Sequence, residues 1–484
     1  MKRRKALQQI GWGLSGGVLA PSLLNACGNK DPGPEVSYSG TVAVIGAGAA
    51  GLYVADILRS KGIKIKLFEA RDQVGGRVRS LRNQSIIKYP FGPQLSSDFP
   101  VELGAQTIIG TDSIIGKIYQ NYRLVSAAYP TSGNHYVLDN KAKPETGWGG
   151  DVDFVNAKNF RANLRNNIGS GQSVQAAVQA AVGTRAHGML NGWIGNAYGG
   201  DNDTMGIGEL AQEETLRLND STNDGKILGL STNPMQDVVI SRFSAVQQFV
   251  QLNTPITSIN YAGDPIVLTA KDGSTYEVGK VVVTVPVSIL KNESITFSPA
   301  LPSGFKDSLA KIGMGASMRV VIEFKKNFWG DTVGFILGSA NVPEYFSVGL
   351  GRSVFNRTLS ITVNGAKAAQ YSALGDGVVD AILADLDLLY AGQGTQFVRQ
   401  DILTMKSIFV REDWTTMDYI LGGYSYPLAG ATNDDRKAIG QPISGKLFFA
   451  GEGTDITGQA GMVNGALASA ERASIDVIKS ILNP

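Results

Sequence analysis

The chain has very little of the chemistry that builds disulfides and metal sites. Among 484 residues there is one cysteine, Cys27, and there are two histidines, His135 and His187. A single cysteine excludes an internal disulfide framework. Two isolated histidines form no zinc or non-haem iron ligand pattern, so we predict no metal site. We expect His135 in a turn or strand and His187 in a helical stretch, with neither acting in catalysis.

The chain also lacks a strong charge of either sign and a long hydrophobic run. Its formal net charge is +2, and four of its cations stand within the first five residues. Without a basic patch, nucleic acid is not an expected partner. A chain with 43% apolar residues and 59 glycines is long enough for two domains of a turn-rich α/β fold.

The N-terminal segment is typical of an export signal. A basic start precedes an apolar stretch that is too short and too rich in glycine for a transmembrane helix. The sequence Leu-Asn-Ala-Cys at 24–27 is similar to the box cleaved by lipoprotein signal peptidase. Arg3 and Arg4 are similar to a twin-arginine signal, although Ala6 holds the usual aromatic position.

We therefore predict a signal at residues 1–27 and a polar linker at 28–39, with its prolines at Pro32 and Pro34. Lipidated Cys27 would hold the protein on a membrane. We expect an exported protein of the periplasm or cell envelope. An ordinary secretory signal with an incidental cysteine is the alternative.

A glycine-rich motif opens the folded part of the chain. The apolar run at 41–46 predicts a buried parallel strand, and Gly46, Gly48 and Gly51 form G-x-G-x-x-G. The first glycine permits a tight turn and the second lets the backbone approach a pyrophosphate. The third lets the predicted helix at 49–60 pack closely on the sheet. The N-terminus of that helix can bind phosphates.

A second predicted strand, at 63–69, supports the same interpretation. It ends at Glu69, 23 residues after Gly46. A carboxylate at this place can accept hydrogen bonds from both hydroxyls of an adenosine ribose. Strand, glycines, helix, strand and Glu69 in register predict a dinucleotide site.

The segments around this unit resemble those of the flavin amine oxidase family, which includes monoamine, polyamine and L-amino acid oxidases. EARDQVGGR, starting at Glu69, resembles the family's E-A-R-x-x-x-G-G-R. Further matches are VELGAQT at 101–107, VQLNTPITSI at 250–259, KVVVTVPVSIL at 280–290, LFFAGEGTD at 447–455 and GMVNGALASAERA at 461–473. The resemblance covers roughly residues 39–481.

The resemblance implies an extended, tightly bound FAD. The bond would be noncovalent, because the only thiol is Cys27. Arg77 would lie near the pyrophosphate and flavin, Glu452 near the ribityl or pyrophosphate, and the backbone of 104–107 beside the isoalloxazine ring. The cofactor-binding residues implied are Gly46, Gly48, Ala49, Ala50, Gly51, Glu69, Ala70, Arg71, Gly76, Arg77, Gly104, Ala105, Gln106, Thr107, Ile256, Gly451, Glu452, Gly461, Met462 and Val463.

The expected fold class is α/β, with a Rossmann-like FAD-binding domain interleaved with a mixed-sheet plus helical substrate domain. The FAD-binding domain would comprise residues 40–110, 238–298 and 442–484, and the substrate domain 111–237 and 299–441. Within the latter, we expect helices over 151–218, a surface loop over 219–237, and strands at 319–324 and 358–363.

Arg319 is the first predicted catalytic residue. The family usually has a lysine that holds a water near the flavin, in G-x-x-x-K-V before an F-W pair. The matching segment here is Gly-Ala-Ser-Met-Arg-Val at 315–320, before Phe328 and Trp329. Arginine keeps the positive charge but does not act as a base. The alternative is that Arg319 merely pairs with a carboxylate in the sheet.

Tyr424 is the second predicted catalytic residue. The segment 413–430 resembles the one that carries the first of two aromatic side chains flanking the substrate, with Tyr424 the best match and Tyr426 the fallback. Met462 stands at the second aromatic position. In L-amino acid oxidases an arginine follows E-L-G-x. In this chain Gln106, Thr107 and Ile108 follow, so that arginine is missing at this position. We expect Trp414 and Tyr419 to be core aromatics.

Three functions remain open from the sequence. The first is oxidation of the CH–NH group of an amine or amino acid to an imine by hydride transfer to FAD, with oxygen or a quinone-type acceptor taking the electrons. The second is an FAD-dependent dehydrogenase or desaturase of a more apolar substrate. The third is a non-catalytic lipoprotein with a flavoprotein fold.

Overall fold

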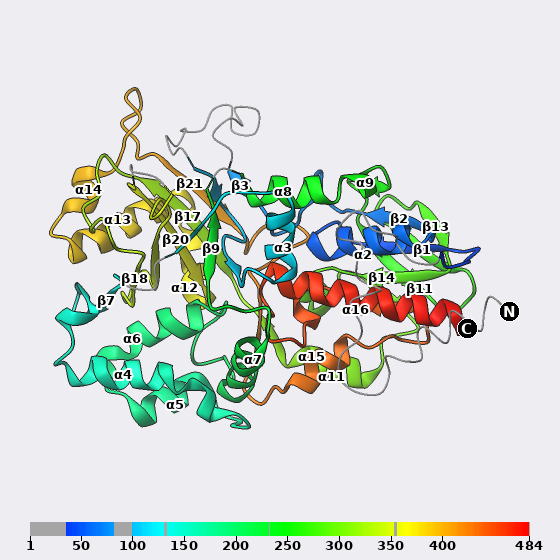
Figure 1. Cartoon of the computed structure of the whole chain (residues 1–484), viewed down its shortest axis with the longest axis horizontal. Coiled ribbons are helices and arrows are strands. Elements are labelled where there is room, and N and C mark those ends of the chain that lie inside the picture. The colour runs from blue at the N-terminus through cyan, green and yellow to red at the C-terminus, as the bar shows by residue number, and fades with distance from the viewer. Residues whose placement is uncertain (1–34, 82–98, 130–132, 232, 353–355, 484) are drawn as a thin grey trace.

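The computed structural model describes residues 35–81, 99–129, 133–231, 233–352 and 356–483. The predicted signal at 1–27 and most of the predicted linker lie outside these ranges. Figure 1 shows two regions side by side along the longest axis, with the helices α2 and α16 in one and the helices α13 and α14 in the other. No helix in the described part of the chain is both long and apolar enough to cross a bilayer.

The first region is built on a parallel five-stranded sheet. Its strand order is β10-β2-β1-β14-β23, and every neighbouring pair is parallel. The strands are β1 (Thr41–Ile45), β2 (Lys64–Phe68), β10 (Val250–Gln251), β14 (Lys280–Val283) and β23 (Leu447–Phe449). Three separate parts of the chain therefore assemble one sheet, as the expected interleaving requires. The predicted helix at 49–60 is observed as α2 (Ala49–Ser60).

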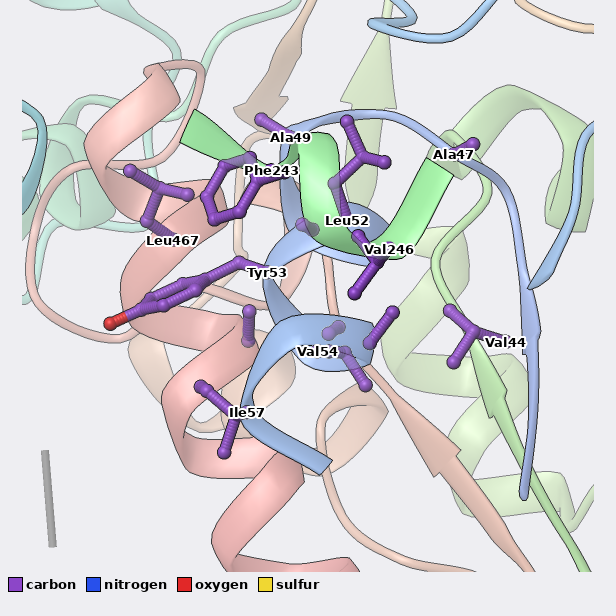
Figure 2. Packing of buried hydrophobic residues seen from close by; sticks show 14 of the residues in the cluster. Val44, Ala47, Ala49, Leu52, Tyr53, Val54, Ile57, Phe243, Val246 and Leu467 are labelled. Carbon is purple, nitrogen blue, oxygen red and sulfur yellow. The ribbon is translucent and has the colours of Figure 1, made fainter. Parts of the chain in front are cut away.

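Two helices pack together beside one face of this sheet. They are α2 and α16 (Val463–Leu482), which lie 418 positions apart at the contact between Tyr53 and Glu471. The Tyr53 hydroxyl donates to Glu471 Oε1 at 2.7 Å, and its ring lies 5.5 Å from that of Phe243. Figure 2 shows Tyr53, Phe243 and Leu467 gathered in this core. Each such buried large side chain stabilises the fold by about 1.5–3 kcal/mol.

The opposite face of the same sheet packs on a second, smaller sheet. Alternation along β1 places Val42 and Val44 in the helix-side core and Ala43 and Ile45 in the other core. The smaller sheet has the order β13-β12-β11-β15. Its strands are β11 (Ile256–Asn260), β12 (Ile266–Ala270), β13 (Thr275–Val278) and β15 (Thr296–Ser298), and the helices nearby are α10 (Val287–Lys291) and α11 (Ser303–Ala310).

The second region contains a mixed seven-stranded sheet, with the order β21-β17-β20-β19-β18-β7-β8. The expected strands at 319–324 and 358–363 are observed as its neighbouring strands β17 and β20. The strands are β7 (His135–Leu138), β8 (Lys141–Pro144), β17 (Ser317–Glu323), β18 (Phe335–Leu337), β19 (Glu344–Ser347), β20 (Thr358–Asn364) and β21 (Phe409–Asp413). Only β7 and β18 pair in parallel, so the sheet is mainly antiparallel.

The two faces of the seven-stranded sheet differ in chemistry. Alternate residues such as Val320, Ile361 and Tyr345 are apolar and pack against helices behind the sheet. Those helices are α12 (Gly365–Ala373), α13 (Val378–Leu389) and α14 (Gln393–Phe397). The residues between them face the other way, and on that face Arg319 and Thr362 are polar whereas Val321 and Phe346 are apolar. This face therefore turns away from the helices and towards the first region.

Helices dominate residues 151–218, as expected. They include α4 (Val152–Ala162), α5 (Val174–Ala181), α6 (His187–Leu190), a π-helical turn (Asn191–Asn196) and α7 (Ile207–Asn219). His135 begins β7 and His187 begins α6, so the predicted local structure of both histidines is confirmed. Among the described residues, no group of three His, Cys, Asp or Glu side chains is placed to hold a metal ion.

The expected surface loop at 219–237 is partly wrong. It contains β9 (Ile227–Leu230), which pairs with β5 (Ile108–Ile109) and β6 (Ser126–Ala128), and its end enters α8 (Met235–Arg242). Polar and glycine residues around β9 suggested a loop, but pairing partners about a hundred positions away order it. Helix α3 (Ile114–Asn121), between those partners, packs in the core beside α2 and α16.

Candidate active site

The glycine-rich turn has the geometry that the sequence predicts. Gly46 has φ of +103°, which side chains rarely adopt, and it forms the tight turn after β1. A Cβ on Gly51 would lie 1.8 Å from the Gly46 carbonyl oxygen, so α2 crosses β1 too closely for any other residue. The Thr284 hydroxyl donates to that oxygen at 3.0 Å. The first and third glycines thus have the predicted structural roles.

At two other glycines a side-chain Cβ would meet only one heavy atom, at an ordinary contact distance. A Cβ on Gly48 would have its nearest neighbour, the Gly76 Cα, at 4.0 Å. A Cβ on Gly451 would lie 3.8 Å from the Thr284 carbonyl oxygen. Gly48 and Gly75 form an isolated bridge, so the two glycine turns lie side by side. The absence of side chains here leaves a backbone-lined cradle, which suits a pyrophosphate.

Glu69 lies next to this cradle, at the end of β2. It is buried, and its carboxylate accepts hydrogen bonds from the backbone N–H groups of Ala47 at 2.7 Å and Arg71 at 3.0 Å. Burial raises the pKa of Glu69, while these two bonds oppose the rise. Each carboxylate oxygen retains a lone pair for a further donor. The position fits recognition of ribose hydroxyls.

The matched segment at 250–259 lies beside Glu69. The Glu69 N–H donates to the Gln251 carbonyl at 2.9 Å, and the Thr254 N–H donates to the Glu69 carbonyl at 2.8 Å. These bonds fix the turn between β10 and β11, where Ile256 is the first residue of β11. Ile256 is 5% exposed. Ala70 and Arg71 continue from Glu69 beneath this turn.

An ion pair joins two motifs that are far apart in the sequence. Arg77 Nη1 donates to Glu452 Oε1 at 2.9 Å and to the Gly423 carbonyl at 2.7 Å. Glu452 also accepts from the Ser425 hydroxyl at 2.6 Å and from the Gly461 N–H at 2.8 Å. Glu452 is thus bonded to the protein on several sides, and its expected contact with the cofactor stays a prediction.

Tyr424 lies between Gly423, which is bonded to Arg77, and Ser425, which is bonded to Glu452. Its hydroxyl donates towards the Ala197 carbonyl at 3.1 Å and accepts from Asn364 Nδ2 at 3.0 Å. A Cβ on Gly461 would lie 3.0 Å from the ring, and one on Gly199 would lie 2.7 Å from it. Gly461 directly precedes Met462, the N-cap of α16, so Tyr424 stands beside residues that the resemblance implies are cofactor-binding.

The fallback residue, Tyr426, lies in a different environment. It is 8% exposed and packs in the core of the helical layer, close to Gly200 and Gly313. Tyr424 is therefore the better candidate for contact with a substrate. Trp414 is buried as expected, and its Nε1 donates to the Leu103 carbonyl at 3.0 Å. It also touches Gly104, and so supports the segment expected beside the isoalloxazine ring.

Arg319 projects from the polar face of β17 towards that segment. Its guanidinium donates to Gln106 Oε1 and, at 3.3 Å, to the Glu102 carbonyl. Burial lowers the pKa of Arg319, and the nearby groups Glu344 and Tyr424 oppose that change. An arginine stays charged at neutral pH in such surroundings. The structure therefore brings Arg319 beside Gln106 and near Tyr424, as a fixed cation.

The sequence analysis did not find Glu344, which belongs to the same place. It begins β19, one residue before Tyr345, which pairs with Ile361. Strand alternation then turns Glu344 to the polar face that carries Arg319 and Thr362. Burial raises the pKa of Glu344 to about 7, although the charge of Arg319 lowers it. A single carboxylate in a short apolar strand was the only available signal.

Further polar groups lie on the same face of the seven-stranded sheet as Arg319 and Glu344. The Thr362 hydroxyl and Asn364 Oδ1 have no hydrogen-bond partner among the described residues, and both are buried. The Asn196 side chain, at the end of the π-helical turn, donates to the Thr362 carbonyl at 3.0 Å and accepts from the Asn364 N–H at 2.8 Å. π-Helical turns often occur at functional sites. Here the turn fixes the strand opposite Arg319.

A surface cavity of about 400 Å³ lies elsewhere, between α10, β15 and α11. It is lined by residues such as Leu290, Phe297 and Leu309. None of the predicted site residues borders it. The geometry of the cradle, Tyr424 and Arg319 marks the candidate active site more specifically than this cavity does.

Two protein-family models match this chain. Residues 215–478 match the family described as flavin containing amine oxidoreductase. Residues 44–121 match the NAD(P)-binding Rossmann-like domain. The first match spans more than half of the chain and includes Arg319, Tyr424 and Glu452.

Several curated proteins are similar over most of the chain. Polyamine oxidase 4 of Oryza sativa subsp. japonica is 24% identical over 496 residues, covering 97% of this chain and 93% of the relative. Lysine-specific histone demethylase 1B of Mus musculus is 24% identical over 91% of this chain. The match covers 53% of that relative, so the chain spans about half the length of the demethylase.

Solved structures share the fold at low identity. Cyclohexylamine oxidase from Brevibacterium oxydans IH-35A aligns with a TM-score of 0.73 at 18% identity, covering 92% of this chain and 99% of the other. Wild-type putrescine oxidase bound to putrescine aligns with a TM-score of 0.72 at 19% identity, covering 91% and 99%. The expected α/β fold class is confirmed.

Proposed function

This chain belongs to the family of flavin containing amine oxidoreductases, which are FAD-dependent enzymes, and we propose that it oxidises an amine that contacts Tyr424 and Glu344. The CH–NH group would become an imine, which water hydrolyses. The observation that carries this proposal is the arrangement of Tyr424, Glu344 and Arg319 around one place beside the segment 104–107.

FAD, when bound, supplies the acceptor for the hydride and later passes the electrons on. The cradle at Gly48 and Gly451 and the carboxylate of Glu69 are the residues that would hold it. The few neighbours of the two glycines fit a group that the backbone must approach closely. The chain has no thiol other than Cys27, so the bond to the flavin would be noncovalent.

Tyr424 would orient the substrate. Burial, with the charge of Glu344 next, raises the pKa of Tyr424, so its hydroxyl keeps its proton at neutral pH. That hydroxyl is already bonded to the backbone and to Asn364, which fixes the ring. A fixed ring face at Gly461 can hold a carbon–nitrogen bond in one orientation and exclude water. Met462 at the second aromatic position leaves the other side apolar but not aromatic.

Glu344 favours a cationic substrate. A carboxylate facing the site attracts an ammonium group, and burial strengthens that attraction. An amino acid is the second candidate, and Arg319 favours it. No carboxylate of the described residues lies within ion-pair distance of Arg319, so its charge is available to a substrate carboxylate. The predicted alternatives, an apolar-substrate desaturase and a non-catalytic lipoprotein, gain no support from the family match.

The products distinguish the two candidates. Oxidation of a primary amine yields ammonia and an aldehyde or ketone, whereas an α-amino acid yields ammonia and a 2-oxo acid. We expect aldehyde or ketone from amines, with an artificial electron acceptor present. Formation of 2-oxo acids alone would move the assignment to amino acids, and no product from either class would refute the proposal.

We further propose that the protein is exported and held on a membrane of the cell envelope by lipidated Cys27. The support is the sequence of residues 1–27, which lie outside the described structure. The electron acceptor would be oxygen or a quinone-type molecule. Arg319 in place of the family's lysine supports slow reaction with oxygen, because arginine does not exchange protons with a bound water at neutral pH.

A further inference from the structure

A fully buried cation lies behind the candidate active site. Arg436, on α15 (Asn433–Ile439), is 0% exposed. Its Nε donates to Glu213 Oε1 of α7 at 2.5 Å. A buried arginine is retained where its charge is paired and its donors are used. Glu213 supplies the pairing charge and Nη1 donates towards the FAD-binding region, while Nη2 has no hydrogen-bond partner among the described residues.

The Ser425 hydroxyl connects Arg436 to Glu452. Arg436 Nη1 donates to Ser425 Oγ at 2.9 Å and to the Gly453 carbonyl at 3.1 Å. Ser425 Oγ in turn donates to Glu452 Oε2 at 2.6 Å. Because Ser425 has only one hydroxyl hydrogen, accepting from Arg436 directs that hydrogen at Glu452. The donor direction therefore runs from Arg436 through Ser425 to Glu452, while the Arg436 Nε donates the other way, to Glu213.

Glu452 accepts backbone hydrogen bonds from two parts of the site, one beside α16 and one beside Tyr424. It accepts from the Gly461 N–H at 2.8 Å, next to the N-terminus of α16. It also accepts from the Ser425 N–H at 3.3 Å, and this bond fixes the residue that follows Tyr424. Although burial opposes ionisation, Arg77, Ser425 and Arg436 together hold the pKa of Glu452 below its ordinary value. Glu452 is therefore ionised at neutral pH, and it lies between the N-terminus of α16 and Tyr424.

We propose that Arg436 is a positioning residue of the active site, acting through Ser425 and Glu452 to fix Tyr424 and the N-terminus of α16 against the flavin. The inference rests on FAD binding in the cradle, as stated above. Arg436 itself touches neither that cradle nor Tyr424 in any contact of the described residues. Its effect on the flavin would therefore come from geometry and from the charge that it holds near Glu452.

The test uses Ser425→Ala in the FAD-loaded full chain. This change removes the hydroxyl between Arg436 and Glu452 and leaves both charges in place. We expect the variant to fold and to bind FAD, with a shifted midpoint potential, an altered visible flavin spectrum, and a kcat lowered roughly tenfold. Ser425→Thr retains a hydroxyl and should restore both the potential and the spectrum.

Ser339→Ala is the matched control. The Ser339 hydroxyl is also buried and donates to a carboxylate, that of Asp385, which α13 carries on the helix-covered side of the seven-stranded sheet. We expect this variant to lose some thermal stability and to keep the wild-type potential and spectrum. The comparison separates a positioning effect from a general loss of packing.

A second variant tests Arg436 directly. Arg436→Met combined with Glu213→Gln removes the buried pair together, so that neither charge is left alone. We expect the same shift of potential as in Ser425→Ala. Stepwise photoreduction beside a reference dye measures the flavin midpoint potential without any substrate, so this test remains valid if no amine is oxidised. An unchanged potential and spectrum in Ser425→Ala would overturn the proposal, whatever the outcome for the double variant.

Discussion

The Arg77 guanidinium donates to the Glu452 carboxylate across 2.9 Å, although the two residues stand 375 positions apart. Arg77 closes the family-like segment that starts at Glu69, and Glu452 lies in the one at 447–455. Their bonds to the Gly423 carbonyl and the Ser425 N–H hold the backbone on either side of Tyr424. The cofactor motifs thus position the residue proposed to contact the substrate.

Glu69→Ala should weaken FAD retention. The change removes the acceptor proposed for two ribose hydroxyls, and each hydrogen bond to a charged acceptor contributes about 1.5–3 kcal/mol. Acid precipitation should release FAD from the wild-type protein into the supernatant, and equilibrium dialysis should show a much higher Kd for the variant. Glu277→Ala, at an exposed position of β13, is the control and should bind FAD normally. Flavin that stays in the acid pellet would contradict noncovalent binding.

Glu344→Gln should change the pH dependence of amine binding. The pKa of Glu344 is raised to about 7, so its carboxyl is neutral below that pH and anionic above it. An amine with a pKa near 10 stays cationic throughout, so its affinity should rise as the pH rises through 7. The variant should lose this step and bind roughly tenfold more weakly at pH 8.

Anaerobic binding titrations from pH 6 to pH 8.5 measure this effect. Glu293→Gln, at a side chain 80% exposed on the surface, is the control and should retain the step. An identical pH profile in Glu344→Gln would show that another group, or the substrate itself, titrates in this range.

Arg319→Lys should speed reoxidation of the reduced flavin by oxygen, and Arg319→Met should slow it. A fixed cation beside the reduced flavin stabilises negative charge, but only lysine can also exchange protons with a bound water. We therefore expect slow oxygen reaction in the wild-type protein, with an artificial acceptor giving faster turnover.

Stopped-flow reoxidation after photoreduction measures these rates without any substrate. Arg399→Lys is the control, since Arg399 pairs with Glu323 at 2.6 Å and has no contact with Gln106 among the described residues. If the wild-type protein reoxidises as fast as Arg319→Lys, the interpretation of this arginine is wrong.

Cys27→Ser should abolish lipid attachment. The variant is expected as an unprocessed or soluble form, because the modified thiol would be the only anchor that the sequence predicts. Fractionation of cells that express each form, with detection of the chain by antibody, gives the result. A variant that still fractionates with membranes exactly as the wild type does would assign anchoring to another segment.

Local signals allowed much of the fold to be predicted. The glycine spacing after β1 and the following apolar run predicted α2 at its observed ends, because those residues act through their own backbone and neighbours. The family, the FAD cofactor and the α/β fold class are confirmed by the match over residues 215–478 and by the structural comparisons. The domain boundaries and the individual site residues stay predictions.

The rest depends on contacts between distant segments. β9 forms because β5 and β6 lie on either side of it, which no local pattern around residue 227 indicates. Glu344 faces the site only because β19 pairs with β20 in one register. Arg436 looks like an ordinary surface charge in the helix sequence NDDRKAI, yet the fold buries it completely. Tertiary pairing and burial therefore decided the residues that the sequence analysis missed.

Anaerobic mixing of FAD-loaded protein with a panel of amines tests the central claim most directly. The account predicts that at least one amine bleaches the oxidised flavin absorption without oxygen, and that Tyr424→Ala slows this bleaching by an order of magnitude or more. Photoreduction of the same sample confirms that the flavin can be reduced. A flavin that photoreduces normally but stays oxidised with every amine would contradict the assignment of this site to amine oxidation.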